Sequence, residues 1–111
     1  MNLFYLDTAQ AGLAWMKRYY RRNPQLSQKK AVASLMQAEN QLMEMPFSGA
    51  TFEDYEGVRV LPLQGTAFSF LYTVARDAVW IIDVHDQRGY RSGEALRQFS
   101  RELGKRVQDI G

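Results

Sequence analysis

The sequence predicts an α+β domain in which helices pack on one side of a small, largely antiparallel sheet. Residues 7–23 and 27–46 repeat apolar side chains at helical spacing, whereas residues 58–84 contain three runs rich in β-branched and aromatic side chains. A strand before the first helix and a helix after the last strand complete the order: strand, helix, helix, three strands, helix. With 111 residues, the chain is expected to form a single domain spanning residues 1–111.

The N-terminal part is predicted to form a strand followed by a helix. Leu3–Leu6 is a short apolar run, and Asp7 or Thr8 can cap the helix that follows, since a short oxygen side chain accepts from unpaired backbone donors. The apolar face of this helix is expected to comprise Ala9, Leu13, Met16 and Tyr20. Asn23-Pro24 ends the helix, because the residue before proline is forced out of the helical region.

A second helix is expected to begin at the cap Ser27 and to end by Pro46, forming an antiparallel hairpin with the first. Its predicted apolar face comprises Ala31, Val32, Leu35, Met36, Leu42 and Met43. Methionines are typical of adaptable binding surfaces and also of helix cores in which soft side chains fill gaps. We favour the core for Met36 and Met43, beside Leu35 and Leu42.

The sheet is predicted from three strands that follow a loop over residues 47–56. Val58–Leu63 is the first, and Pro62 restricts it to an edge or a terminus. The other two strands, Phe68–Val74 and Val79–Val84, are joined by a tight turn over residues 75–78. Strict alternation places Phe68, Phe70, Tyr72 and Val74 on one face of the middle strand. In the last strand it groups Val79, Ile81 and Asp83 on one face and Trp80, Ile82 and Val84 on the other.

The C-terminal part begins with a basic and aromatic segment over residues 85–91. Ser92 then caps a predicted last helix over residues 92–111, whose apolar stripe includes Leu96, Phe99 and Leu103. Such a stripe either packs on the chain's own sheet, which we favour, or meets a helix or segment of a partner.

Composition excludes several classes of function. The 14 basic and 12 acidic side chains give a net charge of only +2, which by itself does not indicate nucleic acid. Six cations in residues 17–30 have no acid between them, and we interpret them as a solvated helix face. No cysteine and a single histidine argue against disulfides and zinc, and no cofactor is expected. No signal peptide and no membrane-length apolar run is found, so we expect a cytoplasmic protein that makes no membrane contact.

Three pieces of the sequence together resemble the RelE/ParE superfamily of bacterial toxin–antitoxin systems. The first is Phe4–Ala9 with Leu13 and Tyr19-Tyr20, and the second is Met45-Pro46-Phe47 followed by Gly57–Leu63. The third is Phe68–Val74 with Val79–Val84 and the polar segment 85–91. The resemblance covers residues 3–91 and leaves 92–111 as a variable C-terminal helix. It implies either a RelE-type ribonuclease that cuts messenger RNA on the ribosome or a ParE-type inhibitor of DNA gyrase.

The residues at the expected site favour the ParE-like branch. The resemblance places cations of a ribonuclease site where this chain has Val60, Pro62 and Ser69. A ribonuclease needs such cations to stabilise the charge of the phosphorane. No catalytic residue is therefore favoured, and the candidates under the ribonuclease alternative are Arg59, His85, Arg88 and Tyr90. His85 is a possible general base, but we favour a hydrogen-bonding or exposed role.

The resemblance also implies the partners. They are a cognate antitoxin and DNA gyrase, with the ribosome and mRNA as the alternative target, or an antitoxin alone if the chain is a non-toxic homologue. We expect partner binding through Arg59, Arg88, Tyr90, Arg91, Leu96, Phe99 and Leu103.

Overall fold

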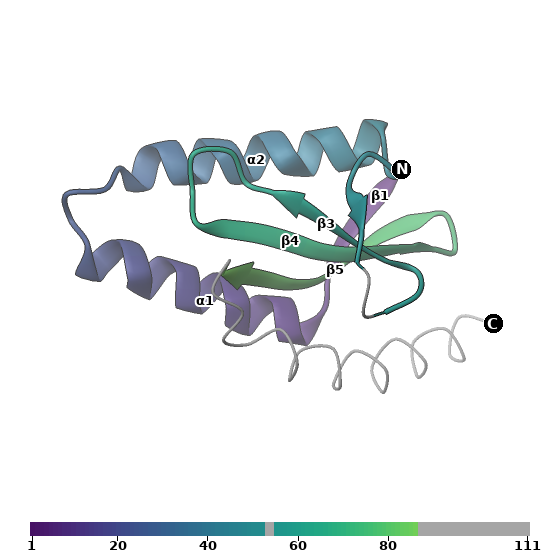
Figure 1. Cartoon of the computed structure of the whole chain (residues 1–111), viewed down its shortest axis with the longest axis horizontal. Helices are drawn as coiled ribbons and strands as arrows, with labels where there is room; N and C mark the ends of the chain where they lie inside the picture. Colours follow the sequence, from purple (N-terminus) through teal and green to yellow (C-terminus); the bar gives the residue numbers. More distant parts are fainter. Residues whose placement is uncertain (53–54, 87–111) are drawn as a thin grey trace.

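The computed structural model describes residues 1–52 and 55–86, so the predictions for Arg88, Tyr90, Arg91 and the helix 92–111, with Leu96, Phe99 and Leu103, lie outside it. The elements are β1 (Asn2–Tyr5), α1 (Asp7–Arg22), α2 (Gln28–Glu44), β2 (Ala50–Thr51), β3 (Val58–Pro62), β4 (Phe68–Ala75) and β5 (Ala78–Asp86) (Figure 1). The predicted helical hairpin and the three successive strands are confirmed. Ser27 caps α2 as expected, its hydroxyl accepting from the Lys30 backbone N–H at 3.2 Å.

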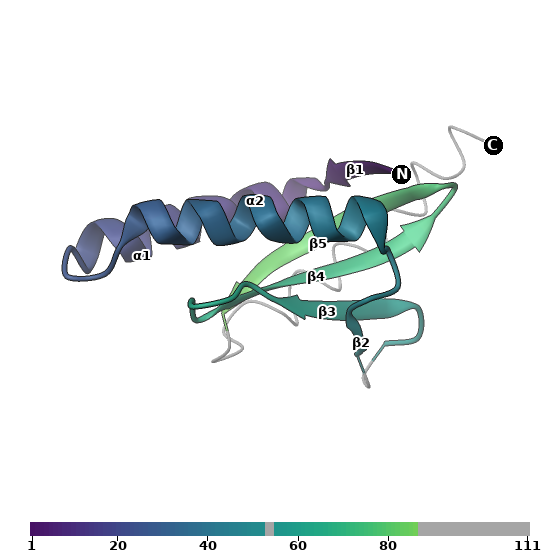
Figure 2. The ribbon, with the colours of Figure 1, turned by 90° about the horizontal axis from the view of Figure 1, so that it is seen from above.

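The five strands form one mixed sheet in the order β1-β5-β4-β3-β2. Only β1 runs parallel to its neighbour β5, and the other pairs are antiparallel. Both helices lie on the same side of the sheet (Figure 2). The predicted α+β architecture with a largely antiparallel sheet is therefore confirmed. No helix within residues 1–52 and 55–86 is both long and apolar enough to cross a membrane.

The main core lies between the sheet and the two helices. It joins the buried side of α1 and α2 to alternate residues of β4, which are Phe68, Phe70 and Tyr72, as the sequence predicted. A second cluster on the other face of the sheet contains Val58, Leu71, Trp80 and Ile82. Pro62 is the last residue of β3, where its missing N–H costs no interior ladder bond.

A β-bulge in β5 overturns the predicted alternation of that strand. Leu71 of β4 pairs with Asp83 and the next residue, Tyr72, pairs with Ile81, so Ile82 is the extra residue. Val84 consequently packs in the main core with Val79 and Ile81, and not with Trp80 and Ile82 as predicted. Strict alternation fails because one inserted residue reverses which face every later side chain occupies.

The predicted cap of α1, Asp7 or Thr8, is wrong. Leu6 is the N-cap residue, and no side chain caps the helix. Thr8, which is buried in the first turn, instead donates its hydroxyl to the backbone carbonyl of Ile82. Because a bulge leaves ladder groups unpaired, Thr8 satisfies a buried acceptor that the sheet cannot.

The two-residue strand β2 was missed by the sequence prediction, which assigned residues 47–56 to a loop. Its residues are exposed and give no period to detect. Contacts from other strands hold it in place: the Gly49 N–H donates to the Tyr72 hydroxyl at 2.9 Å, and Arg59 Nη1 donates to the Gly49 carbonyl at 2.8 Å. A Cβ atom at Gly49 would lie 2.6 Å from the Tyr72 hydroxyl, so this close approach requires glycine.

Candidate partner-binding site

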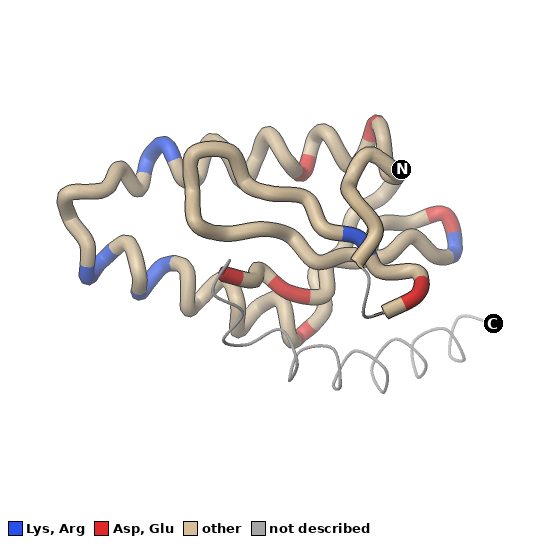
Figure 3. Tube along the Cα trace, in the orientation of Figure 1, with Lys and Arg blue, Asp and Glu red and all other residues tan. Residues whose placement is uncertain are grey.

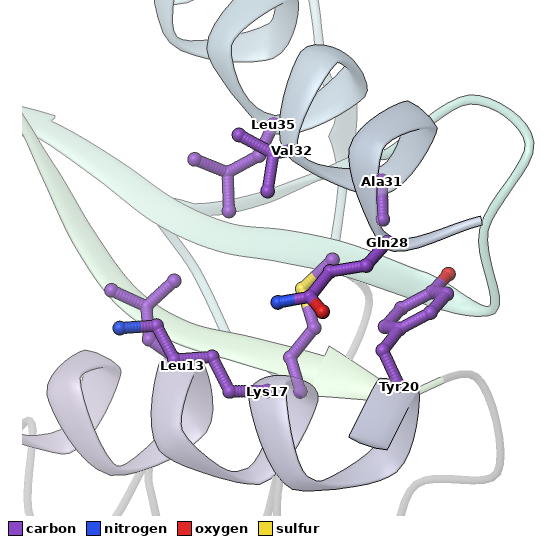
Figure 4. A pocket seen from close by; sticks show the side chains of 8 residues that line it. Leu13, Lys17, Tyr20, Gln28, Ala31, Val32 and Leu35 are labelled. Carbon is purple, nitrogen blue, oxygen red and sulfur yellow. The ribbon is translucent and has the colours of Figure 1, made fainter. Parts of the chain in front are cut away.

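An apolar groove of about 260 Å³ runs between α1 and α2 on the outside of the helical hairpin (Figure 4). It is lined by Leu13, Met16, Lys17 and Tyr20 of α1 and by Gln28, Ala31, Val32 and Leu35 of α2. The groove opens between the two helices because they make few close contacts with each other. A narrow apolar channel between two rigid helices can accept the side chains of another helix or extended segment.

The outer face of α2 continues this apolar surface. Val32 is 50% exposed and Met36 57% exposed, while Met43 and Met45 are also exposed. Our assignment of Met36 and Met43 to the core is therefore wrong. Burial in α2 is confined to Ala31, Ala38 and Leu42, because the helix contacts the sheet only along that narrow line. Flexible thioether side chains on a surface suit a partner that has to be accommodated by repacking.

Charge is distributed unevenly around the groove. Lysines and arginines of α1 and α2 gather at the end of the hairpin where the two helices are joined, whereas acidic residues lie mainly elsewhere (Figure 3). Lys17 lines the groove itself, so the apolar channel has a cationic border. This arrangement is complementary to an amphipathic segment with acidic flanks.

Arg59, a predicted partner-binding residue, is held within the protein. Its Nη1 donates to the backbone carbonyls of Phe47 at 3.2 Å and Gly49 at 2.8 Å, and its guanidinium lies 5.3 Å from the centre of the Phe47 ring. These contacts fasten the segment between α2 and β3 to the sheet. Partner binding by Arg59 stays a prediction, but its observed hydrogen bonds have a structural role, because they stabilise the position of the segment between α2 and β3.

His85 lies near the end of β5, where it pairs with Ser69 of β4. Burial lowers its pKa below the ordinary value of 6.5, and the nearby Asp86 carboxylate opposes this in part. Its Nδ1 has no hydrogen-bond partner within the described residues. Asp86 itself accepts a hydrogen bond from Trp15 Nε1 at 3.2 Å, which ties the end of β5 to α1.

The lowered pKa of His85 predicts a loss of stability in mild acid. As pH falls through 6.5, the unfolded chain takes up a proton that the folded chain resists, so stability present above this pH is progressively lost. We expect His85→Gln to reduce the fall in melting temperature between pH 7.5 and 5.5. Thermal melts of both proteins at each pH measure this, and an equal or larger fall in the variant would contradict it.

The structure does not bring Arg59 and His85 together. Arg59 pairs with Tyr72 and His85 pairs with Ser69, so the two lie on opposite sides of β4, roughly 10 Å apart across the sheet and roughly 10 Å apart along it. The other two ribonuclease candidates, Arg88 and Tyr90, lie outside the described residues. Ser69 and Val60 carry no charge, so neither supplies the cation that a phosphate site needs, and Ser69 is also buried. Within residues 1–52 and 55–86 no group of acids and histidine has the arrangement of a metal site.

Sequence reasoning did not identify the groove between α1 and α2. The available signal was the breadth of the apolar face of α2, because Val32, Leu35 and Met36 extend around more of the helix than Ala31, Ala38 and Leu42 need for the core. A face wider than one packing partner can cover indicates a second contact surface.

Comparison with known proteins supports the fold. No protein-family model and no curated protein sequence matches the chain. A solved structure described as "Chromosomal ParDE TA system from P. aeruginosa" is similar, with a TM-score of 0.60 and 22% sequence identity over 78% of this chain and 95% of that chain. The likeness is one of fold, and it agrees with the fold that the RelE/ParE resemblance predicted.

Proposed function

We propose that this chain is the toxin of a type II toxin–antitoxin pair and that a cognate antitoxin neutralises it by occupying the groove between α1 and α2. The observation that carries the proposal is an apolar groove on a fold shared with a chain of a ParDE system. An unpartnered apolar groove is unfavourable in water, and a segment that folds into it recovers that free energy.

The chemistry of the groove indicates what the antitoxin segment looks like. A helix with apolar side chains at i, i+3, i+4 and i+7 presents a row that fits a channel between two helices. Acidic residues on its flanks would pair with Lys17 and the neighbouring cations of the hairpin. Such a segment is short, acidic and disordered until it binds.

The proposed target of the free toxin is DNA gyrase, inhibited by binding. The separation of Arg59 from His85 and the internal contacts of Arg59 support a binding protein over a ribonuclease. The predicted contact residues Arg88, Tyr90 and Arg91, and the apolar stripe Leu96, Phe99 and Leu103, stay candidates for the target or antitoxin surface. A toxin with this target acts in the cytoplasm.

Two assays test the antitoxin pairing and the gyrase target separately. Co-expression with the small acidic protein encoded beside this one is expected to yield a stable complex and to raise the melting temperature by linkage. If the protein encoded beside the toxin neither co-purifies with it nor raises its melting temperature, the pairing is refuted.

The purified toxin is expected to inhibit gyrase supercoiling and to leave ribosome-bound message intact. The reverse result would establish the ribonuclease alternative.

The double variant Arg88→Ala/Arg91→Ala tests the predicted target surface. We expect weaker inhibition of gyrase supercoiling, because these cations would steer and hold the encounter, with little change in the melting curve. Supercoiling titrations and thermal melts of both proteins measure the two effects. Full inhibition by the double variant would place the target surface elsewhere on the chain.

A further inference from the structure

Six lysines and arginines lie toward the end of the helical hairpin where α1 and α2 are joined (Figure 3). We call this surface the cationic tip, defined by Lys17, Arg18, Arg21, Arg22, Lys29 and Lys30. All six are exposed, and residues 8–38 contain no acidic residue at all. Within the described part of the chain, no ion pair engages any of them.

The placement of these cations is unfavourable for the free protein. Lys17 and Arg21 are four residues apart on α1, as are Arg18 and Arg22, and like charges at this spacing repel. Lys29 and Lys30 lie in the first turn of α2, where the helix dipole disfavours positive charge and where no acid is present. The dipole does favour Arg21 and Arg22 in the last turn of α1, and the Arg18 guanidinium lies 5.8 Å from the centre of the Trp15 ring, but neither contact accounts for Lys17, Lys29 and Lys30.

A hollow of about 430 Å³ adjoins the tip, between the α1–α2 connection and the β3–β4 turn. Its wall includes Lys30 and Ser27 together with residues 65–67 and the two tyrosines Tyr19 and Tyr20. Those two rings are not free to stack on bases, because they pack edge-on against each other at 5.4 Å and both contact the Phe68 ring, Tyr19 edge-on at 5.4 Å and Tyr20 at a tilt at 6.2 Å. The surface thus offers cations without an aromatic platform, which suits a phosphate backbone and not unstacked bases.

We propose that the cationic tip binds the sugar–phosphate backbone of duplex DNA. A regular polyanion relieves the repulsion among the six cations, and its affinity comes from release of the counterions condensed on the duplex. This DNA contact goes beyond the proposed function, because a toxin that binds only the gyrase protein needs no contact with DNA. The contact would hold the toxin beside the DNA on which gyrase works.

The test measures binding of the purified full chain to a fluorescent 20-base-pair duplex by anisotropy, without gyrase or antitoxin. Each phosphate contact contributes about −0.9 to the slope of log affinity against log salt, so six contacts give a slope of about −5 between 50 and 200 mM KCl. Lys29→Gln/Lys30→Gln is expected to make the slope shallower by about 2. It is also expected to lower affinity at 0.1 M salt by about 50-fold.

A charge-matched pair of variants separates the tip from net charge. Lys29→Gln and Arg76→Gln each remove one cation, but Arg76 is in the β4–β5 connection at the opposite end of the molecule (Figure 1). We expect about an 8-fold loss of affinity for Lys29→Gln at 0.1 M salt and less than a 2-fold loss for Arg76→Gln. Melting curves verify that the variants are folded. Because removing a cation reduces repulsion within the cationic tip, the tip variants are expected to be at least as stable as the parent.

Four results would overturn the proposal. They are no binding at 50 mM KCl, equal losses from Lys29→Gln and Arg76→Gln, tighter binding to duplex RNA or single-stranded DNA, and equal binding of polyglutamate. The last would show that the tip receives an acidic peptide. Binding of polyglutamate would agree with the acidic antitoxin flanks proposed above, whereas the other three results do not bear on antitoxin binding or on gyrase inhibition, so failure here is distinguishable from failure of the proposed function.

Discussion

Replacing Val32 with glutamate is expected to weaken antitoxin binding at least 100-fold while leaving the fold of the free toxin intact. Val32 lines the groove between α1 and α2 and is 50% exposed in the free chain, so a polar side chain there costs little stability. In the complex, the same carboxylate would be buried against apolar side chains. That penalty is about 3 kcal/mol or more, which corresponds to about two orders of magnitude in affinity.

Titration calorimetry of the antitoxin against the two toxins measures the effect. Ala33→Glu is the matched control, because it adds the same charge at the adjacent, exposed position of α2, which does not line the groove. We expect Ala33→Glu to bind within a few-fold of the parent. If both variants bind alike, the groove is not the antitoxin site, even if the pair itself co-purifies.

The second large effect is expected from Gly12→Ala, which should destabilise the protein. Gly12 lies on the buried side of α1, where the helix crosses β5. A Cβ atom there would lie 2.3 Å from the Asp83 Oδ1 atom and 2.8 Å from the Val84 backbone nitrogen and oxygen. Because the sheet backbone cannot move aside, α1 must shift, and overpacking of this kind costs about 1–3 kcal/mol or more. The shift would also disturb the groove that α1 shares with α2.

Intrinsic helix propensity alone predicts that Gly12→Ala raises the free energy of unfolding, whereas overpacking against β5 predicts that it lowers it, so the measured sign distinguishes the two effects. In an exposed helical position, alanine is about 1 kcal/mol more favourable than glycine. Ala14→Gly, at an exposed position two residues further along α1, measures that preference in the same helix and is expected to cost about this amount. Denaturant unfolding of both variants gives the two free energies. A Gly12→Ala protein more stable than the parent would show that α1 does not approach β5 as closely as described.

The sequence could locate most elements because their signals are local. Asn23-Pro24 and Ser27 bound the two helices, since a proline restricts the residue before it and a hydroxyl caps a helix wherever they occur. Alternating aromatic residues from Phe68 to Tyr72 marked β4 and its core face. The turn between β4 and β5 was also found, although its residues Arg76 and Asp77 both adopt positive φ, where asparagine and glycine are usual.

Much of the candidate site could not be predicted, since its members are defined by their neighbours in space. Exposed Val32 and Met36 look in sequence like any other apolar helix positions, and only the narrow contact between α2 and the sheet leaves them uncovered. Arg59 looks like a free cation, yet two backbone carbonyls from a segment ten or more residues earlier accept its hydrogen bonds. Long-range packing of this kind leaves no periodic signal.

The sequence by itself therefore determined the α+β class, the helical hairpin, strands β3 to β5 and the concentration of cations in residues 17–30, because periodicity, caps, turns and charge are properties of neighbouring residues. Only the tertiary structure decided the bulge at Ile82, which reversed the face of Val84, and the pairing of β2, which depends on Tyr72 and Arg59. It alone also decided that the groove between α1 and α2 stays open. The bulge, the pairing of β2 and the open groove all depend on contacts between residues far apart in sequence, and no local sequence pattern encodes such contacts.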